Sequence, residues 1–255
     1  MFQKLFQYRE FLSTSIRKEI RGKYKKSFLG ILWSFLNPLL MLMVYAIIFP
    51  IILKSSEKNY VMFLMTALIP WTFFTTVVMQ GASTIVANGN ILKKVYFPRE
   101  ILPISTVTSG LVNFLISCII IFIFLIFTGI GFSKYILLLP FIILIEYLLL
   151  LGIVFILSSV TVYLRDLEHI IGVVIQALFY GTPIVYSLSA IPSKFMWVFK
   201  LNPMAYIIQG YRDILYYQTM PNLQGLFLIL AFSLGLIIVG YQIFSYLQKN
   251  FAEEL

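Results

Sequence analysis

The sequence has little charge, one cysteine and one histidine. Charged residues make up 11% of its 255 residues, whereas a soluble domain carries about 25%, so the chain cannot cover a water-facing surface with solvated side chains. A lone cysteine, Cys118, excludes an intrachain disulfide and a cysteine-based metal site. His169 cannot form a metal cluster by itself. We therefore expect no metal centre.

A phosphate-binding loop is also missing. The pattern GxxxxGK[ST], whose backbone amides wrap around nucleotide phosphates, does not occur in the chain. Any ATP used must be hydrolysed by another chain, so we expect no catalytic residue and no bound cofactor here. The net charge of +9 would suggest nucleic-acid binding in a soluble protein. In a membrane protein the position of the basic residues matters more, and we expect no nucleic-acid partner.

What the sequence does have is long apolar runs. Hydrophobic residues make up 60% of the chain and the mean hydropathy is +0.95. Runs of about 20 apolar residues are long enough to cross a bilayer, and these lack the alternation of barrel strands, so we expect helices. The sequence predicts an all-α membrane protein with six spans, at 28–53, 61–82, 104–127, 135–161, 170–188 and 226–247. The fifth is the shortest and is interrupted by Gly172, Gly181 and Pro183, which predicts a bent or re-entrant segment.

Basic residues predict the orientation of these spans. Most lie before the first span, in the loop after the second, at Arg165 and at Lys249. The other side carries Lys54, Lys58, Lys134, Lys194, Lys200 and Arg212. The positive-inside rule places both termini in the cytoplasm. We expect no cleaved signal peptide, because residues 1–27 are charged throughout and contain no apolar run.

Residues 1–27 form a separate segment ahead of the membrane domain, 28–255. Leu12, Ile16, Ile20 and Tyr24 recur every four residues, with Arg17 and other cations largely off that stripe. The pattern predicts a basic amphipathic helix in the cytoplasmic interface, in contact with membrane lipids. A basic flank that only sets the topology is the alternative.

Four segments give the chain a resemblance to a known family. They are RGKYKKSFLGILWSFLNPLLMLMVYAIIF (21–49), VYFPREILP (95–103), VYLRDLEHIIGVVIQALFYGTPIVYS (162–187) and LNPMAYIIQGYRD (201–213). In this order they resemble the permease subunits of ABC-2 type exporters of polysaccharides and polyol phosphates. The resemblance covers nearly the whole chain and is more specific than any single segment.

The resemblance implies a machine of two permeases and two ATP-binding subunits, in which the partner uses ATP and Mg²⁺. It would export a lipid-linked polymer, such as O-antigen, capsule or teichoic acid, across the bacterial cytoplasmic membrane. Two copies of this chain are expected to form the conduit. The sequence does not tell which polymer is carried. Two other functions stay open: a proton-coupled secondary transporter using Glu146, and a membrane scaffold without transport.

The resemblance also implies contact with the ATPase at the first inner loop, through a coupling helix, and such contact stays open for the second inner loop. In the first loop, Pro98 restrains Phe97 to an extended conformation and a helix can begin near Glu100. The candidates for coupling to the ATPase are Tyr96, Phe97, Pro98, Arg99 and Glu100, with Arg165 and Asp166 in the second loop. By pattern alone the first is an ordinary basic loop, and Arg165 and Asp166 are local caps and contacts.

Several membrane residues are candidates for contact with the substrate. Sugar rings present C–H faces that stack on aromatic side chains, and the candidates for such a path are Trp33, Tyr45, Phe49, Phe73 and Phe74. Packing is the alternative for each. Glu146 is the only formal charge deep in a span; it is a candidate proton relay or, as the alternative, a neutral carboxyl bonded to a neighbouring helix. Residues 189–225 are expected to form short helices at the outer interface, as a gate or a passive cap.

Overall fold

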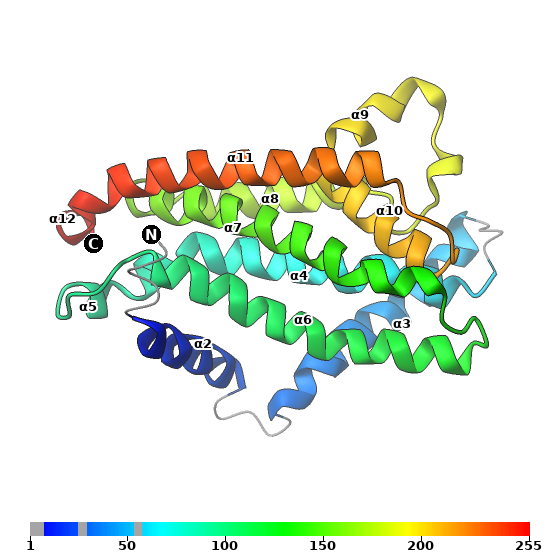
Figure 1. Ribbon diagram of the computed structural model, residues 1–255, viewed down its shortest axis with the longest axis horizontal. Coiled ribbons are helices and arrows are strands. Elements are labelled where there is room, and N and C mark those ends of the chain that lie inside the picture. The colour runs from blue at the N-terminus through cyan, green and yellow to red at the C-terminus, as the bar shows by residue number, and fades with distance from the viewer. Residues whose placement is uncertain (1–7, 25–29, 54–57) are drawn as a thin grey trace.

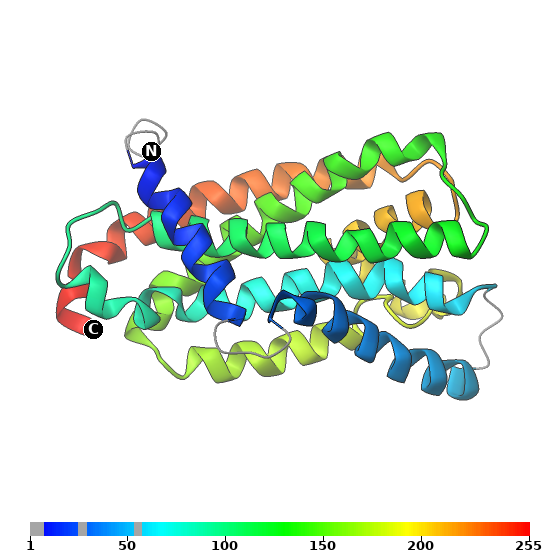
Figure 2. The same cartoon turned by 90° about the horizontal axis from the view of Figure 1, so that it is seen from below.

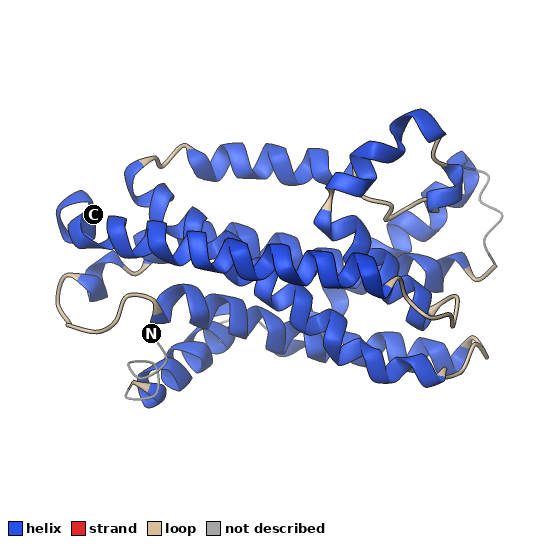
Figure 3. Cartoon of the chain, turned by 45° about the horizontal axis from the view of Figure 1, so that its top comes forward, coloured by secondary structure: helices blue, strands red, loops and turns tan. Residues whose placement is uncertain are grey.

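The computed structural model describes residues 8–24, 30–53 and 58–255, and every regular element in these ranges is helical (Figures 1 and 3). The ends of the predicted 1–27 segment and the first residues of the predicted 28–53 span lie outside the described residues. The helices are α2 (Arg9–Tyr24), α3 (Trp33–Leu53), α4 (Tyr60–Ala87), α5 (Gly89–Leu92), α6 (Ile101–Phe127), α7 (Leu139–Tyr163), α8 (Leu167–Tyr180), α9 (Met196–Leu201), α10 (Pro203–Leu215), α11 (Leu223–Leu247) and α12 (Phe251–Glu254). Short 3-10 turns precede or follow several of them, at Gly30–Leu32, Lys134–Leu138, Leu188–Ala190, Ser193–Phe195 and Gln248–Asn250.

The prediction of an all-α membrane protein is confirmed. Among the described residues, four helical stretches are long and apolar enough to cross a membrane: Tyr60–Ala87, Ile101–Phe127, Lys134–Tyr163 and Leu223–Glu254. Helices α3 and α8 also coincide with predicted spans, but their apolar parts are shorter, at Phe35–Phe49 and Leu167–Tyr180. The predicted fifth span does break, because α8 ends at Tyr180 and residues 181–187 are not helical. Its 14 residues rise only about 21 Å, less than the roughly 30 Å of a hydrocarbon core.

Helix α4 is the centre of the bundle. It contacts α3, α6, α7, α8 and α10, and most of its apolar residues are buried. In Figure 2, α6 and α7 lie on one side of α4, and α3 and α8 lie on the other. Because α4 touches nearly every other long helix, its residues can reach most polar features of the bundle.

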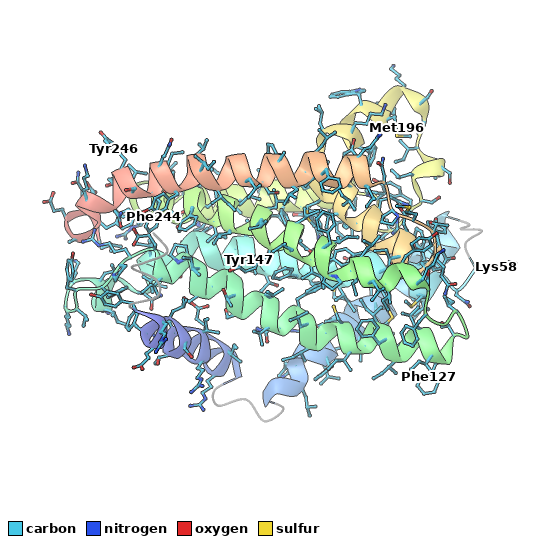
Figure 4. The ribbon with its side chains drawn as sticks, viewed as in Figure 1. Lys58, Phe127, Tyr147, Met196, Phe244 and Tyr246 are labelled. Atoms are coloured by element: carbon cyan, nitrogen blue, oxygen red, sulfur yellow. The ribbon has the colours of Figure 1, made fainter. Side chains whose placement is uncertain are left out.

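Helices α7 and α11 pack along each other and approach most closely at two glycines. A Cβ at Gly240 would lie 2.7 Å from the carbonyl oxygen of Gly152. Small residues let helix backbones come this close, which is a common way for membrane helices to associate. On α11, Phe244 points into the bundle and is fully buried, whereas Tyr246 points away from it (Figure 4).

The bundle has two ends of different construction. At one, which we call the terminal end, lie α2, the α4–α6 loop with α5, the α7–α8 loop and α12 (Figure 1). At the other, the far end, lie Lys58 and Phe127 (Figure 4) and the segment from residue 181 to 222. The expected short helices of 189–225 are present as the 3-10 turns Leu188–Ala190 and Ser193–Phe195 and as α9 and α10, with α9 in the part that protrudes from the bundle.

Candidate functional site

The loop between α4 and α6, residues 88–100, which the sequence analysis predicts to be the first inner loop, packs partly against the rest of the chain. Phe97 is 5% exposed, and its ring centroid lies 4.7 Å from that of Phe11 on α2. Tyr96, the residue before it, is 95% exposed, and Val95 is exposed as well. The predicted helix start is confirmed, since Glu100 is the N-cap residue of α6. The loop therefore turns Phe97 inward and Tyr96 outward.

Arg99 connects this loop to the C-terminal helices. Its guanidinium group donates a hydrogen bond to the carbonyl oxygen of Gln248 and lies 5.8 Å from the ring centroid of Phe251. Phe251 also packs against Phe244 of α11. The loop, α2 and the C-terminal end of the chain are thus one packed cluster.

Helix α2 is fixed to α6 by a residue that the sequence analysis did not single out. The carboxylate of Glu19 accepts hydrogen bonds from the hydroxyls of Ser105 (3.1 Å), Thr106 (3.0 Å) and Ser109 (2.7 Å). The helix predicted in residues 1–27 is present, and its Phe11 and Leu12 pack against the core of the protein. In the sequence, the three hydroxyl residues lie within about one helical turn of each other, and this spacing could have predicted that they share a hydrogen-bond acceptor.

The second inner loop is more open. Arg165 and Asp166 are both exposed. Asp166 occupies the N-cap position of α8, but its side chain accepts no capping hydrogen bond, so the expectation of a cap at this residue is wrong. Tyr163, just before the loop, donates a hydrogen bond to the carbonyl oxygen of Leu247 (2.9 Å).

A cavity of about 640 Å³ lies between α3, α4 and α6. Two of the predicted substrate-path residues, Trp33 and Phe73, line it. The remaining lining residues are small, apolar or neutral and polar: Asn37, Pro38, Met41, Ile69, Thr72, Thr75, Thr76, Val77, Gln80, Gly110, Asn113, Phe114 and Ser117. Neutral polar groups that line a cavity among apolar helices are costly to leave without hydrogen-bond partners, so the cavity is a candidate binding site.

The other three predicted path residues do not line this cavity. Tyr45 contacts Phe49 (5.4 Å between ring centroids) and Phe179 of α8 (5.8 Å). Phe74 is buried and packs on Trp71 (5.3 Å). Sequence reasoning found the aromatic residues but not the neutral polar ones, whose signal was a spacing of four residues on each helix.

Glu146 is fully buried between α7 and α10. Its Oε2 accepts a hydrogen bond from the hydroxyl of Tyr211 (2.8 Å), and its Oε1 has no hydrogen-bond partner among the described residues. This geometry agrees with the alternative interpretation of Glu146, a carboxyl that is hydrogen-bonded to a neighbouring helix.

The far end is organised by Arg212, which the sequence analysis counted among the charges outside the membrane and for which it named no partner. Its side chain is fully buried. The guanidinium group donates to the carbonyl oxygens of Pro183 (2.8 Å) and Ile184 (2.9 Å) and lies 3.7 Å from the ring centroid of Phe63. Arg212 thus holds the non-helical segment that follows α8.

Two further side chains hold the same segment. The amide of Asn202 donates to the carbonyl oxygen of Gly181 (3.0 Å), and the hydroxyl of Tyr60 donates to that of Val185 (2.6 Å). Asn202 also accepts from the backbone of Met204 and caps α10. Buried backbone carbonyl groups outside a helix need hydrogen-bond donors from elsewhere in the protein, and these three residues provide them.

Beside Arg212, Asp213 is the acidic group of α10. Burial raises the pKa of the Asp213 carboxyl above its usual range, and a hydrogen bond from the Gln209 amide (2.7 Å) and the charge of Arg212 oppose this rise. Within residues 8–24, 30–53 and 58–255, no cluster of three or more His, Cys, Asp or Glu side chains has a geometry that could hold a metal ion.

Comparison with known proteins places the chain in a family. The family model described as ABC-2 type transporter matches residues 10–216. The chain belongs to the ABC-2 type transporter family. As a member with several long apolar helices, it is a multi-pass membrane protein.

Its ABC-2 relatives include permeases for polysaccharides. The chain is 33% identical over 257 residues to the O-antigen export system permease protein RfbA of Myxococcus xanthus, covering 100% of this chain and 99% of that one. It is 35% identical over 239 residues to the protein of the same name from Klebsiella pneumoniae, with 93% and 92% covered. A more distant relative, 22% identical over 205 residues and 77% of each chain, is the polysialic acid transport protein KpsM of Escherichia coli.

Proposed function

We propose that this chain is the permease subunit of an ATP-driven exporter that moves a lipid-linked polysaccharide across the bacterial cytoplasmic membrane. The observation that carries the proposal is the full-length similarity to O-antigen export permeases. The uncharged cavity with polar and aromatic lining residues among apolar helices supports it, because a bundle that only scaffolds other proteins has no need to keep such a space. ATP and Mg²⁺ would be bound by a separate subunit.

The proposed topology has six spans, with the terminal end in the cytoplasm. It is supported by the position of α2, both inner loops and α12 at one end of the bundle. A cysteine introduced at Lys194 should react with a membrane-impermeant reagent from outside, and one at Lys93 should not. Cys118, the only natural cysteine, is buried and gives little background. The opposite labelling pattern would contradict the topology.

The proposed ATPase contact is the exposed part of the terminal end. Tyr96, Arg165 and Asp166 face outward there, whereas Phe97 and Arg99 pack within the chain. Pro98, Arg99 and Glu100 would serve the contact by fixing the shape of the loop. We therefore propose Tyr96 as the residue that inserts into the partner and Phe97 as its support.

The proposed assembly contains two copies of the permease and two ATPase subunits. One chain has too few long helices to enclose a polymer path, and most oligomers of a single chain are symmetric dimers. Helices α3 and α8 carry exposed apolar residues on one side of α4, among them Met43, Ile47 and Val173. Crosslinking in the active complex should capture the dimer; an active complex with one permease would contradict it.

Reconstitution tests the function itself. The chain, co-purified with its ATP-binding subunit and placed in vesicles with the lipid-linked polymer of its host, should move the polymer only when ATP is present. Vesicles with the permease alone, and vesicles with a hydrolysis-deficient ATPase, are the controls. Movement that follows a proton gradient and ignores ATP would instead favour a secondary transporter.

A further inference from the structure

The cavity between α3, α4 and α6 is built from residues spaced four apart on each helix. Helix α3 contributes Trp33, Asn37 and Met41, α4 contributes Thr72, Thr76 and Gln80, and α6 contributes Asn113 and Ser117. Residues four apart share one face of a helix. Three helices therefore turn uncharged stripes of mixed polar and apolar side chains toward the same space.

One wall of the cavity, where α4 meets α6, is closely packed. A Cβ at Gly110, one of the lining residues, would lie 2.2 Å from a methyl group of Val77. The rings of Phe73 and Phe114 stack with centroids 4.9 Å apart and planes 15° apart. Helices α4 and α6 thus touch directly along this wall, and the volume of about 640 Å³ is within the range of ligand pockets, roughly 300 to 1,000 Å³.

Among the described residues, the lining of the cavity carries no charged side chain. None of the fifteen lining residues is Lys, Arg, His, Asp or Glu. A phosphate or pyrophosphate group held away from water needs a cation or several converging N–H donors. Because it lacks a cationic side chain, this lining disfavours the phosphate-bearing end of a lipid-linked substrate.

Several hydrogen-bonding groups of the lining already donate within the chain and keep oxygens that can accept from a ligand. The hydroxyl of Thr72 donates to the backbone carbonyl oxygen of Ile69 (2.8 Å), and the hydroxyl of Thr75 donates to the backbone carbonyl oxygen of Thr72 (3.3 Å). The amide of Asn113 donates to the carbonyl oxygen of Ser109 (3.1 Å). A hydroxyl that already donates keeps lone pairs that can only accept. Sugar hydroxyls can donate to such oxygens, whereas an ionised phosphate cannot.

Aromatic surface completes the chemistry expected for a sugar. Trp33 is 36% exposed and belongs to the same lining as Phe73 and Phe114. The apolar C–H face of a pyranose ring packs on such rings while its hydroxyls reach the amides and hydroxyls around them. Water alone would satisfy the polar groups but would leave the aromatic surface without an apolar partner.

We propose that this cavity binds an uncharged, hydroxyl-rich stretch of the exported glycan and not its phosphate-bearing lipid end. The inference rests on the proposed function, and it adds the chemical class of the bound segment and the residues that recognise it. The glycan contacts neutral side chains of α3, α4 and α6.

Photo-crosslinking in the assembled complex tests the occupant. A photoreactive amino acid is placed at Thr76, which lines the cavity, and at Met79, an exposed residue of the same helix outside the lining. The complex with its ATPase is loaded with the lipid-linked polymer of the host and stalled with a non-hydrolysable ATP analogue. We expect a glycan-bearing product, removed by periodate, from Thr76 and not from Met79. Equal products from both positions, no product from Thr76, or a product with a second copy of the chain or with phospholipid would overturn the proposal.

A matched pair of threonine substitutions tests whether the hydroxyls matter. Thr72→Val removes a hydroxyl that lines the cavity. Thr66→Val removes one that makes the same bond, to the carbonyl oxygen three residues earlier (2.9 Å), on the same helix but outside the cavity. Loss of one neutral hydrogen bond to the glycan should lower the export rate roughly 2- to 10-fold in Thr72→Val. Thr66→Val should export as the wild type does.

The two proposals fail in different ways. If the wild-type complex does not export glycan, the proposed function is wrong. If it does export and Thr72→Val is as fast as Thr66→Val, the cavity is not a glycan site and the proposed function stands.

Discussion

The two ends of the bundle differ in how far their non-helical segments are covered by side chains of the same chain. At the far end, Arg212, Asn202 and Tyr60 are directed at backbone carbonyls of one segment, residues 181–185. At the terminal end, Arg165 and Asp166 face outward, and the adjacent loop exposes Tyr96. At the far end buried side chains hold one segment, whereas at the terminal end, where Arg99 and Tyr163 also bond to backbone carbonyls, the loops leave several side chains exposed.

The difference also separates stability from function. A residue that satisfies buried backbone groups should change the free energy of unfolding when it is replaced. An exposed residue at a contact surface should change only the activity of the complex. Substitutions at the two ends can therefore be compared by two readouts, the unfolding temperature of the permease and the activity of the assembled exporter.

The largest effect on stability is expected at Arg212. Arg212→Met keeps much of the side-chain volume but leaves the carbonyl oxygens of Pro183 and Ile184 without donors. Each buried acceptor left unpaired costs about 1 to 3 kcal/mol, so the loss should be about 3 kcal/mol or more. The measurement is thermal unfolding of the purified permease, followed by tryptophan fluorescence.

Two further variants sharpen this result. Lys200→Met removes an exposed basic residue of the same far end and should have little effect. Arg212→Lys keeps the charge near Phe63 but lacks the planar fork that reaches two carbonyls, so its stability should fall between the others. Wild-type stability in Arg212→Met would show that the segment is held by other contacts.

The second prediction compares neighbouring residues of the first inner loop. Phe97→Ala removes a buried ring that packs on Phe11 and should lower stability by about 2 kcal/mol. Tyr96→Ala changes an exposed ring and should alter stability by less than about 0.5 kcal/mol. In the complex with its ATPase, Tyr96→Ala should nevertheless reduce glycan export and weaken binding of the partner. Normal export and normal partner binding by Tyr96→Ala would place the contact elsewhere, with Arg165 and Asp166 as the next candidates.

The third prediction concerns the docking of α2 on α6. Glu19→Leu removes the acceptor for three hydroxyls. Because Glu19 is only half-buried, we expect a loss of about 1 kcal/mol, which corresponds to a roughly fivefold larger undocked fraction. Trypsin should then cleave α2 faster after Arg17, Lys18 or Arg21. Glu10→Leu, at an exposed position of the same helix, is the control, and equal cleavage of both variants would rule out the role of Glu19.

The positions of the main helices could be predicted from the sequence because hydrophobicity over a long run depends on composition alone. Thus α4, α6, α7 and α11 coincide with predicted spans, and the break after Tyr180 followed from Gly181 and Pro183. The polar contacts could not be predicted in this way. Arg212 meets residues nearly 30 positions earlier and Glu19 meets hydroxyls nearly 90 positions later, and no local pattern encodes such pairings.

The candidate site was predicted in the same uneven way. Trp33 and Phe73 stood out because aromatic residues were sought as sugar contacts, and both line the cavity. Nothing in the sequence singled out Thr72, Gln80 or Asn113. They form a candidate site only because the packing of three helices places them around one cavity. Tyr96 and Phe97 show the opposite case, since both were found by their motif but only the fold shows which of them faces outward.

The smallest effect is expected at Asp213, where burial works against the charged form. A carboxyl whose pKa is raised in the folded protein favours folding while it is protonated, and this contribution is lost as the pH rises through the raised pKa. Asp213→Asn is neutral at every pH and keeps a group that can bond to Gln209. Above the raised pKa the variant should therefore be at least as stable as the wild type, and below the ordinary pKa of aspartate any advantage should vanish. Unfolding temperatures measured across this pH range check the sign. A variant that is less stable than the wild type at neutral pH would show that attraction between Asp213 and Arg212 outweighs the burial of the carboxylate.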